Sequence, residues 1–391
     1  MAASPAAAFS PPGRILSPMT YDAIVIGGGL AGTSTALQLA RRGYGVALLE
    51  KDTYPRHKLC GEFLSPEAQD SLRGLGVLGA AREAGAHPVD RAVLSGPDGT
   101  TTAHPLPGTA LGLSRYRLDA LLYRRACRAG VTGRTGTRAT AVEGSLRDGF
   151  AVEAGGDTLT GRMVFGAYGR RGVLDRTLDR SFLDEKSPYV AFKAHYAGVA
   201  PSAPGTIEIH AASGGYCGIG PVEEDRLNVC WIGRIDALKA AGGSPGAMLH
   251  ERLCRNPVLE ERLADLHRVS DRFEAVSQVP LMPKRQFVED VCMIGDAAGM
   301  IAPLCGDGMA MALDTADLVV PLADRFLSGA VPAAAFRSAY HRQWQSAFGR
   351  RLRLGRWVHA AAFRPLATTS LLRACRLLPP LARWLIRHTR G

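Results

Sequence analysis

The stretch YDAIVIGGGLAGTSTALQLARRGYGVALLEKD, Tyr21 to Asp52, decides the fold. An apolar run at Ala23–Ile26 is typical of a buried strand, and it leads directly into a Gly-x-Gly-x-x-Gly pattern. A helix through Arg42 and a second strand at Val46–Leu49 are expected to follow, and the second strand ends on Glu50. The stretch therefore predicts a β-α-β unit of the doubly wound α/β type that holds the pyrophosphate of a dinucleotide.

Each glycine of this pattern has a mechanical reason. Gly27 permits the tight turn, Gly29 lets the backbone approach a pyrophosphate, and Gly32 allows the helix to pack close to the strand. Leu30 and Ala31 open the helix, where unpaired N–H groups and the helix dipole favour negative charge. We expect all five residues to contact the cofactor.

The acidic end of the second strand indicates which nucleotide binds. Glu50 follows the glycine pattern at the spacing typical of these units and can accept hydrogen bonds from both ribose hydroxyls of an adenosine, with Lys51 beside it. An acid at this position disfavours a 2′-phosphate, so FAD or NAD is expected rather than NADP.

A second glycine-bearing stretch, VCMIGDAAGMIAPLCGDGMAMAL from Val291 to Leu313, separates FAD from NAD. An apolar strand at Val291–Ile294 leads to a carboxylate that suits the ribityl chain or its phosphate. The helix that begins near Gly306 would direct its positive end at the pyrimidine edge of a flavin. The residues of this stretch expected to contact FAD are Gly295, Asp296, Pro303, Gly306, Gly308 and Met309.

Together the two stretches resemble the large FAD-dependent superfamily that includes aromatic hydroxylases, geranylgeranyl reductases and flavin-dependent halogenases. The resemblance covers Tyr21 to about Phe326, and SRYRLDALLYRRA, Ser114 to Ala126, fits it too. It implies that Arg115, in preference to Arg117, contacts the cofactor. The chain departs from the aromatic hydroxylases where these carry an Asp-Gly motif after the third strand, because Tyr168-Gly169 stands there instead.

The segment YPRHKLCGEFLSP, Tyr54 to Pro66, is similar to a P-x-x-K-x-C-G-E loop that lies beside the flavin ring in the reductase and halogenase branches. Gly61 would let this loop approach the ring, and Lys58 or Arg56 would screen negative charge on the reduced flavin. Cys60 is expected near the ring as well.

Four residues are candidates for catalysis. Cys60 and Cys305 are predicted to converge on the flavin, either as a redox-active disulfide or as small apolar packing residues. Glu62 and Asp307 are the carboxylates expected nearest the ring, either as general acids or bases or as groups that cap helices and bind backbone N–H groups. Both pairs of alternatives stay open at the level of sequence.

Residues 181–280 change character, because short, partly alternating apolar runs separated by Gly, Pro and acidic turns are typical of an antiparallel sheet. His195, His210 and Tyr216 fall in these runs, and a structural role is favoured for each. The predicted fold is α/β, a Rossmann-type FAD-binding domain with an inserted antiparallel β-sheet substrate domain and a C-terminal helical segment. The predicted divisions are a disordered extension at 1–18, an FAD-binding domain at 19–89, 112–180 and 281–330, a substrate domain at 90–111 and 181–280, and basic helices at 331–391.

The net charge of +11 is concentrated in the C-terminal part of the chain. The range 325–391 holds 13 arginines and no Lys, Asp or Glu, whereas the range 1–324 carries 34 basic and 36 acidic side chains. On a helical wheel Arg373, Arg376, Arg383, Arg387 and Arg390 share one side, opposite Leu, Trp and Ile, with a bend at Pro379-Pro380. Such a segment suits peripheral contact with an anionic membrane, and the alternative is a helical cap with solvated arginines. Nucleic acid is not expected, because no recognition motif accompanies the charge.

The remaining composition indicates a cytoplasmic protein. The eight cysteines form no CxxC pair and no metal-ligand spacing, so neither a disulfide framework nor a metal site is expected. The extension at 1–18 lacks the features of a signal peptide, and no uncharged apolar run is long enough to span a membrane. The protein is expected in the cytoplasm, with peripheral contact at the inner face of the membrane.

We therefore expect an FAD-dependent oxidoreductase that acts on a lipophilic small molecule. The favoured activity is a monooxygenase of secondary metabolism that hydroxylates a phenolic or polyketide ring, with NADH or NADPH as electron donor. One alternative is a geranylgeranyl reductase-like flavoprotein that reduces prenyl-chain double bonds. Another is a non-catalytic prenyl-lipid carrier of the same fold.

Overall fold

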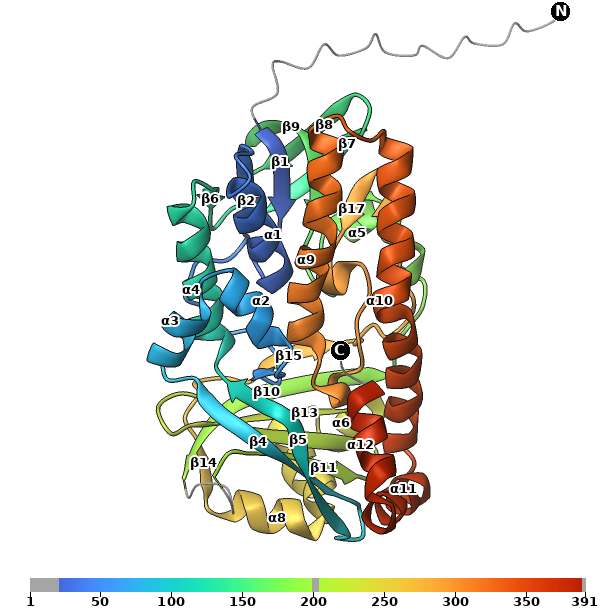
Figure 1. Cartoon of the computed structure of the whole chain (residues 1–391). Coiled ribbons are helices and arrows are strands. Elements are labelled where there is room, and N and C mark those ends of the chain that lie inside the picture. Colours follow the sequence, from blue (N-terminus) through green and yellow to red (C-terminus); the bar gives the residue numbers. More distant parts are fainter. Residues whose placement is uncertain (1–20, 199–203, 389–391) are drawn as a thin grey trace, which may run out of the picture.

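A computed structural model describes residues 21–198 and 204–388, with the side chains of residues 379, 386 and 387 left aside. The extension predicted at 1–18 lies outside these residues. Figure 1 shows two layers, one around a sheet that contains β1 and β9 and one around a sheet that contains β10 and β13, with the long helix α10 running alongside both. The predicted α/β class and its FAD-binding type of architecture are confirmed.

Sheet A forms the first layer and follows the order β16-β17-β9-β1-β2-β6, with β8 and β7 continuing from β9. The strands β17, β9, β1, β2 and β6 run parallel, as a β-α-β architecture requires. Their bounds are β1 Tyr21–Ile26, β2 Val46–Leu49, β6 Thr132–Arg134, β7 Ala139–Ser145, β8 Gly149–Ala154, β9 Asp157–Gly166, β16 Phe287–Val288 and β17 Val291–Met293.

The register of sheet A brings the two glycine-bearing stretches together. Ile26 pairs with Leu49 on one side and with Gly166 on the other, and Gly166 pairs in turn with Met293. The carboxyl ends of β1, β2, β9 and β17 therefore lie along one edge. In open α/β sheets this edge is where ligands bind.

Sheet B forms the second layer and follows the order β14-β10-β13-β12-β11-β4-β5-β3, with β15 paired to β10. Its pairs are antiparallel except β11 with β4. Its bounds are β3 Phe63–Leu64, β4 His87–Ser95, β5 Thr101–Gly112, β10 Tyr189–Gly198, β11 Thr206–Ala212, β12 Gly215–Pro221, β13 Leu227–Arg234, β14 Leu266–Arg268 and β15 Glu274–Ser277. The hairpin β4–β5 thus joins strands from residues 181–280 in one sheet.

The helices pack against both sheets (Figure 1). Their bounds are α1 Leu30–Ala40, α2 Ala68–Gly74, α3 Leu78–Glu83, α4 Arg115–Arg128, α5 Leu174–Thr177, α6 Ile235–Ala240, α7 Pro245–Ala247, α8 Pro257–Ala264, α9 Gly308–Leu327, α10 Ala333–Ala362, α11 Pro365–Leu377 and α12 Pro379–His388. Short single-turn segments are η1 Ser181–Leu183, η2 Met248–Arg252, η3 Leu253–Arg255, η4 Gly295–Ala297 and η5 Pro303–Cys305. No helix among the described residues is both long and apolar enough to cross a membrane.

Helix α10 contacts both layers along its 30 residues. Near its start the Tyr340 hydroxyl donates to the Met293 carbonyl at the end of β17, 2.8 Å away. Near its end His359 lies with its Nδ1 3.4 Å from the Tyr216 hydroxyl of β12. The chain then bends after Leu377, where the sequence predicts a break before Pro379-Pro380.

Candidate active site

The turn between β1 and α1 is shaped by glycines that tolerate no side chain. Gly27 adopts a φ of +112°, and a Cβ on it would lie 2.4 Å from the Ala167 carbonyl oxygen. A Cβ on Gly32 would lie 1.9 Å from the Gly27 carbonyl oxygen, because α1 packs directly onto the turn. A Cβ on Gly29, by contrast, would meet only the ends of two cationic side chains. The turn is therefore closed on the protein side and open on the side that faces these cations.

Those cations gather where an anion would lie on the N-terminus of α1. The hypothetical Gly29 Cβ is 3.4 Å from Lys58 Nζ and 3.6 Å from Arg115 Nη2, and Arg170 lines the same space. Burial, together with the nearby charges of Arg115 and Arg56, lowers the pKa of Lys58 to about 8. A buried ammonium whose protonation is disfavoured by neighbouring cations is an environment that a pyrophosphate would relieve.

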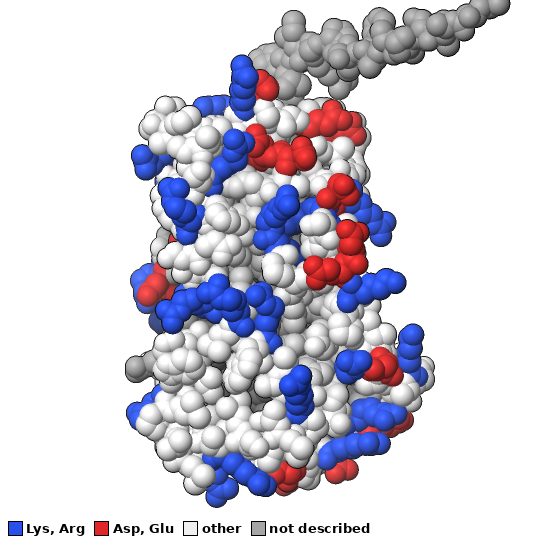
Figure 2. Space-filling model, turned by 90° about the vertical axis from the view of Figure 1, so that its right-hand side faces the viewer, with Lys and Arg blue, Asp and Glu red and all other residues white. Residues whose placement is uncertain are grey.

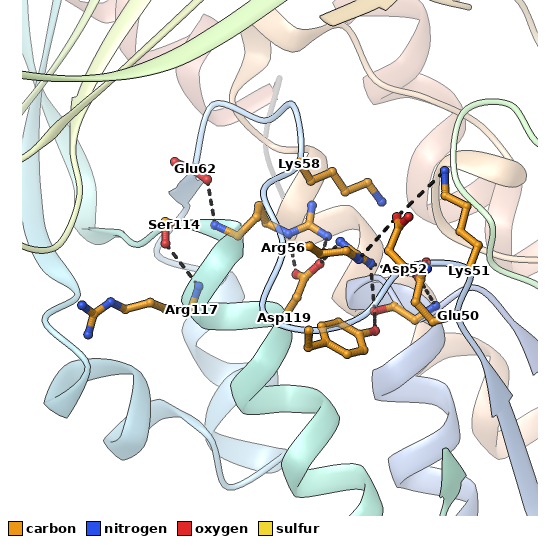
Figure 3. A network of polar contacts seen from close by, with 12 residues as sticks. Glu50, Lys51, Asp52, Arg56, Lys58, Glu62, Ser114, Arg117 and Asp119 are labelled. Atoms are coloured by element: carbon orange, nitrogen blue, oxygen red, sulfur yellow. Dashed lines mark hydrogen bonds and ion pairs between the residues drawn. The ribbon is translucent and has the colours of Figure 1, made fainter. Parts of the chain in front are cut away.

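Glu50 lies at the end of β2 in a network that joins the turn to the loop after it (Figure 3). Its Oε2 accepts from the Gly28 backbone N–H at 2.8 Å and from Arg56 Nη2 at 3.0 Å, and its Oε1 accepts from the Asp52 N–H at 3.1 Å. Arg56 also donates to Asp119 Oδ2 on α4, 3.0 Å away. Glu50 and Lys51 line a side cleft next to the glycine turn, where the adenosine half of a dinucleotide would fit.

The second turn, after β17, lies beside the first across β9. Gly295 has a φ of +58°, and a Cβ on it would lie 2.8 Å from the Ala31 side chain of α1. Asp296 lines both the side cleft and the main cleft. Lys284 Nζ donates to the Asp296 carbonyl at 2.9 Å and to the Arg170 carbonyl at 2.7 Å, and burial lowers the pKa of Lys284 to about 7.

The main cleft lies between these turns and sheet B. From the sheet A side it is lined by Gly29, Leu30, Ala31, Gly295, Asp296, Pro303, Gly306, Gly308 and Met309. From the sheet B side it is lined by apolar residues and by glycines of β12, among them Ala191, Ile207, Ile209, Gly218, Gly220 and Ile232. Tyr216 of β12 also lines this largely apolar wall.

A carboxylate holds the loop that forms one end of the main cleft. Glu62 has a φ of +55°, and its Oε1 accepts from the Arg115 backbone N–H at 2.8 Å and from Lys193 Nζ. Its Oε2 lies 2.6 Å from His195 Nε2. Although burial alone would raise the pKa of Glu62, the Lys193 ammonium and His195 hold it below its usual value. The loop that carries Lys58, Cys60 and Gly61 is thereby fixed over the start of α4.

The residues present fit FAD. The closed glycine turn, the cationic group beside the start of α1 and the acid at the end of β2 match the pyrophosphate and ribose, and the second turn continues toward the main cleft. Residues 20–343 match the family model described as FAD binding domain. The chain belongs to this family.

The curated relatives of this flavoprotein include reductases and a halogenase. It is 28% identical over 325 residues to a menaquinone reductase of Mycolicibacterium smegmatis, which covers 77% of this chain and 76% of that protein. It is 27% identical over 353 residues to digeranylgeranylglycerophospholipid reductase 2 of Methanothermobacter thermautotrophicus, covering 85% and 86%. A flavin-dependent halogenase of Armillaria mellea is 31% identical over 204 residues, covering 48% of this chain and 40% of the halogenase.

Solved structures share the fold at low sequence identity. The myxobacterial chondrochloren halogenase CndH superposes with a TM-score of 0.77 at 22% identity, covering 95% of this chain and 91% of that one. The Pseudomonas aeruginosa protein pqsL, described as a probable FAD-dependent monooxygenase, superposes with a TM-score of 0.73 at 19% identity, covering 90% and 99%. The likeness to these structures concerns the fold, and the family match together with the curated relatives makes the protein an FAD-dependent oxidoreductase.

The structure brings together most of the residues predicted to contact FAD. Arg115 lines the main cleft and forms a paired contact with Asp119, with Nε 2.6 Å from Oδ1 and Nη2 2.8 Å from Oδ2. Arg117 points elsewhere, toward Ala84 and Glu224. Arg56 lies at the adenosine end and is bound to carboxylates there.

The four predicted catalytic residues separate into two groups. Cys60 and Glu62 line the main cleft, whereas Cys305 lines a different cavity, between sheet B and the C-terminal helices. Neither cysteine forms a disulfide in the part of the chain that the structure describes. The catalytic roles of these residues remain predictions.

Asp307 does not act as the side-chain cap that the sequence favours. Helix α9 begins at Gly308, so Asp307 is the preceding residue, and its side chain makes no capping hydrogen bond. Its carboxylate is fully buried and lies 3.3 Å from Arg351 of α10. Asp307 therefore joins α9 to α10, because a buried carboxylate needs a cationic partner more than an exposed helix end needs a cap.

Sequence reasoning missed three basic residues of the site. Arg170 follows β9, and its position after the third strand of the parallel sheet could have indicated a cofactor contact. Lys284 and Lys193 lie in an irregular segment and in a sheet B strand, and no motif marks them. Of the two histidines for which the sequence favours a structural role, His195 binds Glu62 and His210 lies between Ser95 and Glu208.

Proposed function

We propose that the protein is an FAD-dependent monooxygenase that hydroxylates the ring of a lipophilic phenolic substrate. When bound, the flavin supplies the redox chemistry, taking electrons from NADH or NADPH and activating molecular oxygen. The protein's own residues bind the ring, exclude water from it and hold its hydroxyl group. The observation that carries the proposal is a neutral polar pair: Tyr216, which lines the apolar main cleft, and His359 of α10, whose Nδ1 lies 3.4 Å from the Tyr216 hydroxyl.

Tyr216 and His359 stay uncharged at neutral pH. Burial raises the pKa of Tyr216 well above its ordinary value, and burial lowers the pKa of His359 to about 4. A neutral imidazole can accept at Nδ1 from the Tyr216 hydroxyl, 3.4 Å away, while the tyrosine oxygen accepts from a substrate hydroxyl. The pair therefore suits a phenol better than an ionised substrate, which would find no countercharge among the described residues of this wall.

Two carboxylates near the cleft, Glu62 and Asp119, are bound by cationic side chains of the protein. Glu62 is bound by Lys193 and His195, and Asp119 by Arg115 and Arg56. In this proposal they hold the loop and the cofactor-facing cations in place. Positioning of the ring then depends on Tyr216 and on the shape of the apolar wall.

The test is oxygen incorporation by the purified holoprotein. It would be supplied with NADH or NADPH, with 1-naphthol or a 4-alkylphenol, and with oxygen-18 gas. We expect a product that contains one oxygen-18 atom and consumption of NAD(P)H that rises when the phenol is added. Turnover without oxygen-18 in the product would overturn the proposal.

A reductase is the second candidate, because two relatives that span at least three quarters of this chain are reductases and because Cys60 places a thiol in the main cleft. In that case a thiol would deliver a proton to a prenyl carbon. The discriminating measurement uses a menaquinone with a short prenyl chain under anaerobic conditions with reduced flavin. A mass increase of two hydrogens per saturated double bond would favour the reductase. The third alternative, a carrier without redox chemistry, predicts that the purified protein is colourless.

We also propose that the C-terminal helices bind an anionic membrane surface. Five large apolar side chains there are exposed: Trp357, Leu366, Leu377, Leu378 and Trp384. Exposed arginines at 373, 376 and 383 lie on α11 and α12, and Figure 2 shows basic side chains distributed over this face of the molecule. Arg387 and Arg390 lie outside the described side chains. Co-sedimentation with phosphatidylglycerol vesicles, but not with phosphatidylcholine vesicles, is expected, and failure to bind either would contradict the proposal.

A further inference from the structure

A separate apolar chamber lies between sheet B and the C-terminal helices. It has a volume of about 160 Å³ and is walled by strands β4, β5 and β11 on one side and by α10, α11 and α12 on the other. Its apolar lining includes Ala92, Leu94, Ala211, Ala361, Leu372 and Ala382. An apolar cavity of about 150 Å³ is large enough to take up benzene and stays dry when empty.

The polar side chains in the chamber wall are bonded within the protein. Ser95 Oγ lies 2.8 Å from His210 Nδ1 and accepts from Asn256 Nδ2 at 2.7 Å. Thr102 Oγ1 lies 2.9 Å from His104 Nε2, and Thr368 Oγ1 donates to the Ala361 carbonyl at 3.0 Å. Since these groups already have partners, the chamber favours a hydrocarbon over a polar ligand.

The chamber adjoins the main cleft. Ile209 of β11 and Leu304 of η5 line both spaces, so the two are separated by these side chains. Leu304 stands two residues before Gly306, which lies in the flavin-facing turn. Tyr216, the proposed anchor of the substrate hydroxyl, lies on the main-cleft side of this partition.

We propose that the chamber binds the aliphatic tail of the substrate while its ring lies against the flavin. The substrate class is then a phenol with an alkyl or prenyl substituent, an assignment that rests on the proposed function. Because an apolar cavity of about 150 Å³ takes up the six carbons of benzene, the chamber of about 160 Å³ holds about five or six carbons of the tail. Movement of the Leu304 and Ile209 side chains joins the two spaces.

The test is the dependence of binding on chain length in the oxidised holoprotein. Dissociation constants for phenol, 4-propylphenol, 4-pentylphenol and 4-nonylphenol would be measured from the change in flavin absorbance. In the wild type we expect the affinity to rise about fourfold per methylene and to level off near five carbons. In Ala361→Phe, which fills the chamber, we expect the pentyl compound to bind at least tenfold more weakly and phenol to bind within twofold of wild type.

The matched control is the neighbouring Ala360→Phe on the exposed face of α10, which should keep the wild-type dependence on chain length. Ala92→Leu tests the chamber from the sheet side if Ala361→Phe does not fold. If the affinity rises equally with alkyl chain length in the wild type and in a folded chamber variant, the inference is overturned, even if phenols are hydroxylated. If the rise in affinity with chain length is lost in the chamber variants but no phenol is oxygenated, the chamber binds the tail and the proposed monooxygenase activity is contradicted.

Discussion

The two sides of the main cleft are built in different ways. On the side of sheet A, backbone turns and a group of cations form the surface, and several positions leave no room for a Cβ. On the side of sheet B, alternate residues of antiparallel strands form an apolar wall in which Tyr216 is the hydroxyl-bearing residue. The comparison indicates that one side determines whether FAD binds, and that the other determines which substrate reaches it.

The largest effect is expected from Gly32→Ala. This variant tests whether the glycine turn on the side of sheet A tolerates a side chain. The new Cβ would lie 1.9 Å from the Gly27 carbonyl oxygen, so the turn and α1 must separate. We expect loss of bound FAD and destabilisation by about 3 kcal/mol or more, measured by flavin absorbance and denaturant unfolding. Gly74→Ala in α2, where nothing lies within 4 Å of the new Cβ, should leave both unchanged. Normal FAD content in Gly32→Ala would show that the close packing is not required.

Glu62→Gln tests the carboxylate that joins the two sides. It leaves the Lys193 ammonium buried without its charge partner, so destabilisation of about 3–5 kcal/mol is expected at pH 7. Because the pKa of Glu62 is lower in the folded chain than in the unfolded one, this stabilisation is present above the unfolded pKa and is lost as pH falls through the folded pKa. Denaturant unfolding as a function of pH checks this, with the exposed Glu83→Gln as control. A variant as stable as the wild type at pH 7 would contradict the assigned role.

Lys58→Met tests the cationic group. We expect FAD to bind the apoprotein about 10- to 100-fold more weakly at pH 7, because a charged partner of the pyrophosphate is lost. The pKa of Lys58 is about 8 without the anion, so wild-type affinity should decrease as pH rises above 8, and this decrease should be smaller in the variant. Fluorescence titration of FAD measures both effects. Lys239→Met on the exposed surface of α6 is the control, with an expected change of less than about threefold.

The smallest effect is expected from Tyr216→Phe, on the side of sheet B. Loss of one hydrogen bond to the substrate hydroxyl should weaken phenol binding by about tenfold, while FAD content stays at the wild-type level. The dissociation constant for 4-pentylphenol and the flavin absorbance are measured together, with the exposed Tyr116→Phe as control. Unchanged binding would remove Tyr216 from the substrate site.

The difference between the two sides of the main cleft also explains which parts of the site could be predicted from the sequence. The turns at Gly27 and Gly295 depend on backbone conformation, which glycine positions reveal, and the predicted strand at Val46–Leu49 matches β2 residue for residue. The polar contacts of Lys193 and His195 with Glu62 depend on strand register across 131 and 133 residues of sequence. A single sequence does not encode that register in any local pattern, so these partners could not be predicted.

Cys305 and Asp307 illustrate the same limit at shorter range. Both flank Gly306 in the sequence, but the sequence does not reveal which neighbours their side chains meet, because α10 approaches this turn from the C-terminal part of the chain. Asp307 contacts Arg351, and Cys305 lines the chamber that α10 helps to close. Local sequence predicts where a turn lies more reliably than it predicts which neighbour each side chain meets.

The length of α10 has a consequence for access to the flavin. One unbroken helix of 30 residues, about 45 Å long, is attached to sheet A through Tyr340 and lies against sheet B through His359. Opening the cleft by rotating one layer away from the other would break this connection. Entry and exit of a ligand must therefore proceed by local displacement of loops or side chains, so the rate of release will respond to substitutions around Leu304 rather than to an interdomain hinge.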